Sequence, residues 1–115
     1  MLLVREVYVC TREFPANESY GLIAQLRRSA VSVPSNIAEG QGRLSSGEFR
    51  QFLGHARGSL MELETQILIA RDLNYMTHQQ AATLLQHTAE IGRILNGLLS
   101  SLSGSKKLTA PERAS

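Results

Sequence analysis

Apolar side chains recur at spacings of three and four residues from Phe49 to Ala70, and this run restricts the fold more than any other feature. Such spacing places side chains on one face of an α-helix, whereas a strand needs strict alternation. Ser45 and Glu48 have the spacing of a capping box, which marks the start of the helix. The sequence therefore predicts one helix over residues 46–73, about 42 Å long at 1.5 Å per residue.

The first part of the chain contains two more helical patterns. Residues 3–14 have apolar side chains at helical spacing, although the composition of residues 7–11 also fits a short strand. A second helix is expected from near Glu18 to Gly40. Pro34 lies inside it and removes one backbone donor, so this helix should be either kinked or split.

Thr77 and Gln80 form a second capping-box pattern, which predicts a fourth helix that carries apolar side chains to Leu102. Short turns between long helices make neighbouring helices antiparallel, so the predicted fold is an all-α, up-down antiparallel four-helix bundle. We expect the bundle domain over residues 1–103 and a disordered basic tail over residues 104–115.

The basic balance of the chain comes from that tail. The isoelectric point is near 9.0. Residues 1–103 contain nine arginines and nine acidic residues, whereas the tail has Lys106, Lys107 and Arg113 against Glu112. The isoelectric point is therefore weak support for a body that binds nucleic acid.

Composition and missing motifs argue against several functional classes. No stretch approaches the roughly 20 apolar residues of a membrane span, and the start lacks the pattern of a secretory signal. Cys10 has no second cysteine to pair with, so we interpret it as a small buried apolar residue in a cytoplasmic protein.

Sites for metals and phosphates are also missing from the sequence. None of His55, His78 and His87 follows a glutamate by three residues, the spacing that metal sites in helical bundles use. Residues 45–47 precede a helix and could bind an anion, but capping explains them better. We therefore expect no metal, no cofactor, no small-molecule substrate and no enzymatic activity.

One enzymatic alternative stays open. Arg50 and His55 are separated by four residues, and Arg71 and His78 by six. Similar spacings occur in a class of all-helical, metal-independent ribonucleases, in which the pair acts on the scissile phosphate. The pattern is short and arises by chance in an arginine-rich helix, so it ranks third among the functions considered.

Two series with a seven-residue period lie beside the core face of residues 46–73. The first contains Arg43, Arg50, Arg57 and Arg71, with Glu64 at the missing step; the second contains Gly47, Gly54, Met61, Leu68 and Tyr75. Small residues let another backbone approach closely, while Met and Leu offer apolar surface. We interpret the second series as a subunit interface edged by arginines, which predicts a homo-oligomer. The alternative is a solvated face with scattered apolar residues.

Residues 25–43 are rich in polar groups for a helix that lines a core. The candidates for binding nucleic acid or a partner are Arg27, Arg28, Asn36, Glu39, Arg43, Arg50 and Arg57. Arginines bind phosphate with two parallel hydrogen bonds, so Arg27, Arg28 and Arg43 could present a cationic surface to it. The alternative is an ion-pair and hydrogen-bond network that fixes the helix ends.

The same segment carries a family resemblance. The matching residues are Tyr20-Gly21-Leu22, the run from Gln25 to Gly40, Gly42-Arg43, Phe49, Phe52-Leu53, Ala56, Gly58-Ser59-Leu60, the run from Glu62 to Gln66, and Ala70. Over residues 5–76 the chain resembles the four-helix-bundle proteins encoded in intervening sequences of bacterial 23S rRNA genes, and the fourth helix matches by pattern only. The resemblance implies a bundle that assembles as a homopentameric ring.

Related proteins include the accessory subunit of diversity-generating retroelements, which is strongly basic, binds nucleic acid and partners a reverse transcriptase. The charge-neutral body of this chain departs from that relative. We expect a non-enzymatic oligomeric bundle that binds RNA, DNA or a nucleoprotein partner through arginines of its second and third helices. A protein-binding scaffold or adaptor with no nucleic-acid role is the alternative.

Overall fold

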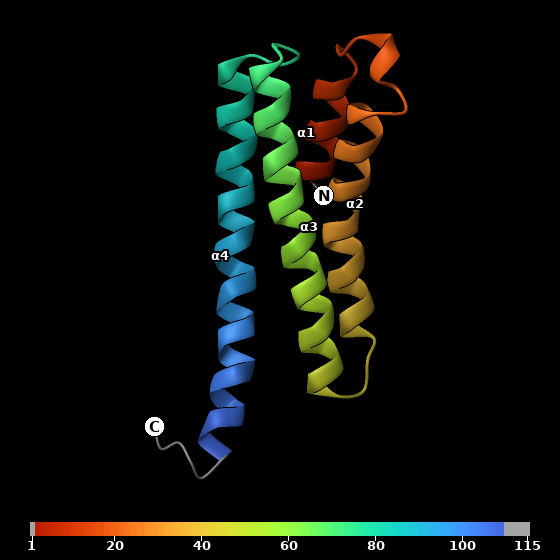
Figure 1. Ribbon diagram of the computed structural model, residues 1–115. Coiled ribbons are helices and arrows are strands. Elements are labelled where there is room, and N and C mark those ends of the chain that lie inside the picture. The colour runs from red at the N-terminus through yellow and green to blue at the C-terminus, as the bar shows by residue number, and fades with distance from the viewer. Residues whose placement is uncertain (1, 110–115) are drawn as a thin grey trace.

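The computed structural model describes the backbone of residues 2–109 and the side chains of residues 2–102. Over this range the chain contains no strand, and its helices are α1 (Leu2–Thr11), the 3-10 helix η1 (Ala16–Glu18), α2 (Leu22–Gln41), α3 (Ser46–Asp72) and α4 (His78–Thr109). The four α-helices run alternately up and down (Figure 1). The predicted all-α antiparallel four-helix bundle is therefore confirmed.

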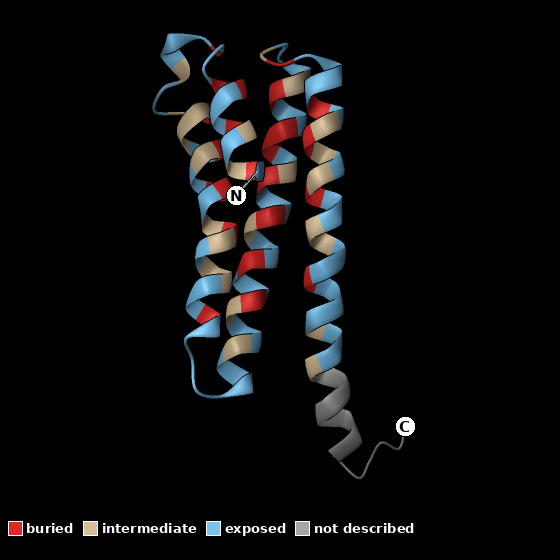
Figure 2. Cartoon of the chain, turned by 180° about the vertical axis from the view of Figure 1, so that it is seen from behind, coloured by how far each residue is buried: buried red, intermediate tan, exposed pale blue. Residues whose placement is uncertain are grey.

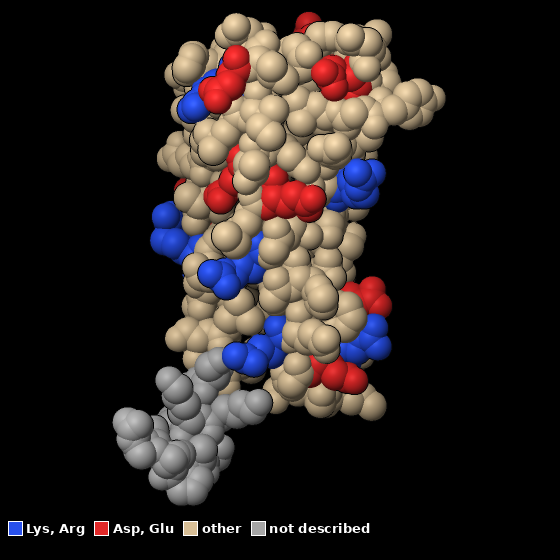
Figure 3. All heavy atoms as spheres, in the orientation of Figure 1, with Lys and Arg blue, Asp and Glu red and all other residues tan. Residues whose placement is uncertain are grey.

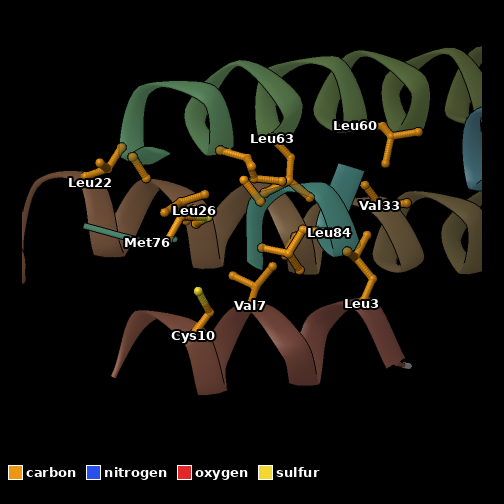
Figure 4. Packing of buried hydrophobic residues seen from close by; sticks show 14 of the residues in the cluster. Leu3, Val7, Cys10, Leu22, Leu26, Val33, Leu60, Leu63, Met76 and Leu84 are labelled. Carbon is orange, nitrogen blue, oxygen red and sulfur yellow. The ribbon is translucent and has the colours of Figure 1, made fainter. Parts of the chain in front are cut away.

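The first element is a helix rather than the strand that its composition also allowed. Leu3, Val7 and Cys10 are buried on one face of α1, and Figure 4 shows them directed toward the other helices. The helix ends at Thr11, whose hydroxyl donates to the Val7 carbonyl oxygen at 2.8 Å. Phe14, which the helical pattern included, is buried in the connection that follows.

The second helix starts later than predicted and is not split. Glu18 lies in η1, and its Oε1 accepts a hydrogen bond from the backbone N–H of Leu22 at 3.1 Å, which caps the start of α2. Pro34 lies within one continuous helix. Near its end, Gly40 is buried against α3, where a Cβ would lie 2.9 Å from the Cβ of Phe52. Only glycine permits this approach without displacing a helix.

Both predicted capping boxes begin helices. Ser45 Oγ accepts from the Glu48 N–H at 3.1 Å at the start of α3. Thr77 Oγ1 accepts from the Gln80 N–H at 3.0 Å, and Gln80 Oε1 accepts from the Thr77 N–H at 2.8 Å, so the second box is reciprocal. Asn74, with φ of 62°, makes the tight turn between α3 and α4.

Each helix packs against two neighbours. α1 and α3 both lie against α2 and α4, on opposite sides of the bundle. The 10 residues of α1 span about half the length of the 20 residues of α2. Figure 2, in which α1 faces the viewer, shows that it covers only the upper part of the bundle. The lower part therefore consists of α2, α3 and α4.

α4 extends past Gly104 to Thr109. The expected boundary at residue 103 therefore lies within α4, and disorder stays a prediction for residues 110–115, which lie outside the described range. None of the described helices combines the length and the apolar character needed to cross a membrane.

Candidate nucleic-acid interface

A surface groove runs between the N-terminal half of α3 and the facing part of α4. Its lower part, about 520 Å³, is lined by Gly47, Arg50, Gln51, Gly54, Arg57 and Leu99. The adjoining part, about 390 Å³, has Arg57, Met61, Glu64, Thr88, Gly92 and Arg93 among its lining residues. Arg57 lines both parts, so they adjoin each other, and we call the two together the α3–α4 groove.

The two helices contribute arginines to opposite walls of this groove. Arg50 and Arg57 are seven residues apart on α3, about 10 Å along the helix axis. Arg93 comes from α4 and lines the same part of the groove as Arg57. The seven-residue period predicts the two α3 arginines on one side of a helix, but no spacing within the sequence relates Arg93 to α3.

The groove is locally cationic although the body of the chain is neutral. Glu64 is the acidic residue at its upper end, and its Oε2 accepts a hydrogen bond from the hydroxyl of Thr88 at 2.7 Å. No acidic residue of the described chain lines the lower part. Figure 3 shows basic atoms on the lower half of this face, with acidic atoms grouped above them at mid-height and further acidic atoms at the lower right. Opposite charges are thus separated along the groove.

Two exposed glycines leave part of the α3 surface without side chains. A Cβ placed on Gly54 or on Gly58 would have no described atom within 4 Å. A glycine inside a helix costs about 1 kcal/mol relative to alanine. Packing within the described chain therefore does not account for either glycine. Of the two, only Gly54 lines the groove.

Arg27, a predicted phosphate ligand, is used to hold α1 against α2. Its Nε donates to Thr11 Oγ1 at 2.9 Å, and its guanidinium lies 4.5 Å from the centre of the Tyr8 ring. Arg28 is exposed on α2 and does not line the α3–α4 groove. The two adjacent arginines therefore do not form one cationic site.

The other α2 candidates also make contacts within the chain. Asn36 Nδ2 donates to Ser32, to its carbonyl oxygen at 2.8 Å and its hydroxyl at 2.9 Å. Arg43 pairs with Glu39 at 2.9 Å, and its guanidinium lies 4.7 Å from the centre of the Phe52 ring. These contacts match the network alternative for residues 25–43 better than a phosphate site.

The predicted interface series divides into three parts. Gly47 and Gly54 line the groove beside the arginines. Met61 and Leu68 are exposed by 56% and 37%. Tyr75 departs from the series because α3 ends at Asp72 and the turn directs its ring inward. Its ring centre lies 5.5 Å from that of Phe14, and its hydroxyl donates to Glu18 Oε2 at 3.0 Å.

The arginine–histidine pairs of the ribonuclease alternative have other surroundings. Arg50 lines the groove, but His55 does not, and its ring packs 5.8 Å from the Phe52 ring. Arg71 pairs with Asp72 at 3.1 Å. Within the described chain, no group of three or more histidine, cysteine, aspartate or glutamate side chains could hold a metal ion.

The fold and the groove define a small antiparallel helical bundle with an arginine-lined surface groove. The sequence profile described as "23S rRNA-intervening sequence protein" matches residues 1–97. The chain belongs to this family, as the resemblance indicated.

Comparison of structures shows the same fold in a protein of unknown function from the S23 ribosomal protein family of Bacteroides thetaiotaomicron. The two chains share 23% sequence identity, the match covers 84% of this chain and 90% of the other, and the TM-score is 0.76. At this identity the likeness supports the fold alone. No curated protein matches the chain.

Proposed function

We propose that this chain is a non-enzymatic, homo-oligomeric bundle protein that binds RNA or DNA through the arginines of the α3–α4 groove. The observation that carries the proposal is that Arg50, Arg57 and Arg93 come from two helices to line one groove. Guanidinium groups bind phosphate oxygens with charge-assisted hydrogen bonds. Three of them along one groove suit a ligand with regularly spaced phosphates.

The contacts of the α2 arginines favour a phosphate site in the α3–α4 groove over the site on α2 that the sequence suggested. Arg27 and Arg43 each stack on an aromatic ring and bond to a side chain of the same chain. Binding a phosphate there would break those contacts. Arg57 and Arg93 line the open volume of the groove, so we assign the functional surface to α3 and α4.

We assign the subunit contact to an exposed apolar residue of the predicted interface series. Met61 and Leu68 are both substantially exposed, but Met61 lines the groove beside Arg57 and Arg93, whereas Leu68 lies outside it. Gly47, Gly54 and Met61 share the groove with arginines, and one surface cannot hold both phosphates and a second subunit. A homo-oligomer joined near Leu68 leaves the groove arginines open to nucleic acid, and the family resemblance suggests a pentamer.

Binding is tested with a fluorescein-labelled RNA and fluorescence anisotropy. We expect the double variant R57Q/R93Q to bind at least tenfold more weakly than the natural chain, because each arginine supplies a charge-assisted contact to phosphate. R12Q/R28Q is the matched control, since it removes the same two charges from exposed sites outside the groove. Equal losses in both variants, or no RNA binding by the natural chain, would contradict the proposal.

An adaptor that binds only protein is the second candidate. The neutral body and the exposed apolar side chains of α3 and α4 favour it, with Ile94 63% exposed. Salt separates the two functions. Phosphate binding weakens steeply between 50 and 200 mM salt, roughly in proportion to the number of phosphates contacted, and apolar protein contacts do not.

Oligomerisation is tested by light scattering at micromolar concentration. We expect a mass that is a multiple of 12.6 kDa and that falls in the variant L68E. A charged side chain at this position would lose solvation if a subunit covered it. A natural chain that scatters as a 12.6 kDa monomer would contradict this part of the proposal.

A further inference from the structure

The lining of the α3–α4 groove indicates which form of nucleic acid it fits. Sites that bind single strands stack the unpaired bases on aromatic side chains. Among the described residues, no aromatic side chain lines the groove, whose lower walls consist of Gly47, Arg50, Gln51, Gly54, Arg57 and Leu99. This composition can hold phosphates but offers no platform for a base.

The dimensions of the groove suit a single backbone ridge. Packed helices have axes about 10 Å apart, so a groove between two of them is too narrow for a whole double helix. Arg50 and Arg57 on one wall and Arg93 on the other can reach a ridge of phosphates from both sides. Gly54 has no described atom within 4 Å of its Cβ position, so the ridge can approach the α3 backbone closely.

We infer that the α3–α4 groove seats one sugar–phosphate ridge of a duplex, without reading its base sequence. The inference rests on the proposed function and narrows its ligand to double-helical RNA or DNA. In a duplex the bases stay paired and stacked, so the groove needs no aromatic platform for them. Glu64 repels phosphate, and it marks the end of the contact toward the top of the bundle.

The test compares a 20-base-pair duplex with the single strand of the same sequence, as RNA and as DNA, by anisotropy with the full chain. We expect duplex binding at least as tight as single-strand binding, with affinities that differ by less than about twofold between unrelated duplex sequences. The slope of log affinity against log salt should become less steep by about 0.9 for each groove arginine replaced by glutamine. The basic tail is common to all variants, so it cancels in these differences.

Two glycine variants test whether duplex binding depends on the groove or on another exposed position of α3. G54L places a leucine on the floor of the groove, and G58L places one on the same helix outside it; both positions are open, so both variants should fold. We expect G54L to weaken duplex binding about tenfold or more and G58L to leave it unchanged.

The outcomes distinguish the inference from the proposed function. If neither duplex nor single strand binds, the proposed function fails. If single strands bind more tightly than duplexes, or if G54L and G58L bind alike, nucleic-acid binding stands and the duplex-ridge inference is overturned.

Discussion

Replacing Gly40 with alanine is expected to destabilise the bundle, although alanine is the better helix former. Gly40 is buried where α2 crosses α3. A Cβ there would lie 2.9 Å from the Cβ of Phe52 and 3.0 Å from Cδ1 of Phe49. Carbon atoms in contact prefer separations of about 3.5–4.0 Å. The Cβ of Phe52 is fixed by its backbone, so a change of rotamer cannot relieve the contact and the helices must part.

Two opposing terms set the size of the effect. Overpacking of this kind costs about 1–3 kcal/mol, while the exchange of glycine for alanine within a helix returns about 1 kcal/mol. We therefore expect G40A to lower the free energy of unfolding by about 1 kcal/mol. The matched control is G58A, where the new Cβ meets nothing within 4 Å. That variant should be stabilised by about 0.5–1 kcal/mol.

Urea unfolding followed by circular dichroism measures both variants at several protein concentrations, because assembly would add a concentration-dependent contribution. The two variants should differ by about 2 kcal/mol, with the natural chain between them; in thermal unfolding this corresponds to roughly 8 °C for a domain of this size. The reasoning is refuted if G40A is as stable as G58A, since the close approach of α2 and α3 would then carry no steric cost.

Three further predictions concern the attachment of the first elements to the bundle. R27A should lower the free energy of unfolding by about 1–2 kcal/mol in urea titrations, because it removes a hydrogen bond and a ring contact between α2 and α1. An unchanged urea midpoint would show that these contacts do not stabilise the bundle. Hydrogen bonding to the Glu18 carboxylate raises the pKa of Tyr75 above its usual 10.0. The hydrogen bond from Tyr75 to Glu18 therefore stabilises the fold below pH 10, and this stabilisation is lost as the pH rises through the raised pKa. From about pH 9 to 12 the urea midpoint of Y75F should fall less than that of the natural chain. Burial raises the pKa of the Cys10 thiol, so iodoacetamide should modify the folded chain at pH 8 much more slowly than the chain unfolded in urea. The folded variant E6A should react faster than the natural chain, because it loses the contact of Glu6 with His87 on α4. Equal rates in folded and unfolded protein would contradict the burial of the thiol.

The helices could be predicted because their signals are local. The three- and four-residue spacing of Leu53, Ala56 and Leu60 identifies the buried face of α3 without knowledge of its neighbours. Capping boxes work in the same way, since their partners are three residues apart. The start of α2 was missed because Glu18 caps it from a separate 3-10 helix, through a side chain whose orientation the sequence does not reveal.

The candidate site was only partly predictable. A seven-residue period places Arg50 and Arg57 on one side of α3, and the structure brings both into one groove. Nothing in the sequence relates them to Arg93, which reaches the groove because α4 packs antiparallel against α3. Nor does the sequence reveal the contacts of Arg27, whose hydrogen bond is accepted by Thr11 of another helix.

The sequence by itself therefore determines the helices of this protein, most of their ends, the buried face of each and membership of its family. Those properties depend on periodicity and on neighbours a few residues away. Tertiary packing alone decides which arginines hold the bundle together and which line a surface, and it forms the groove from two helices. The reason is that the use of a long charged side chain depends on what the neighbouring helix places within its reach.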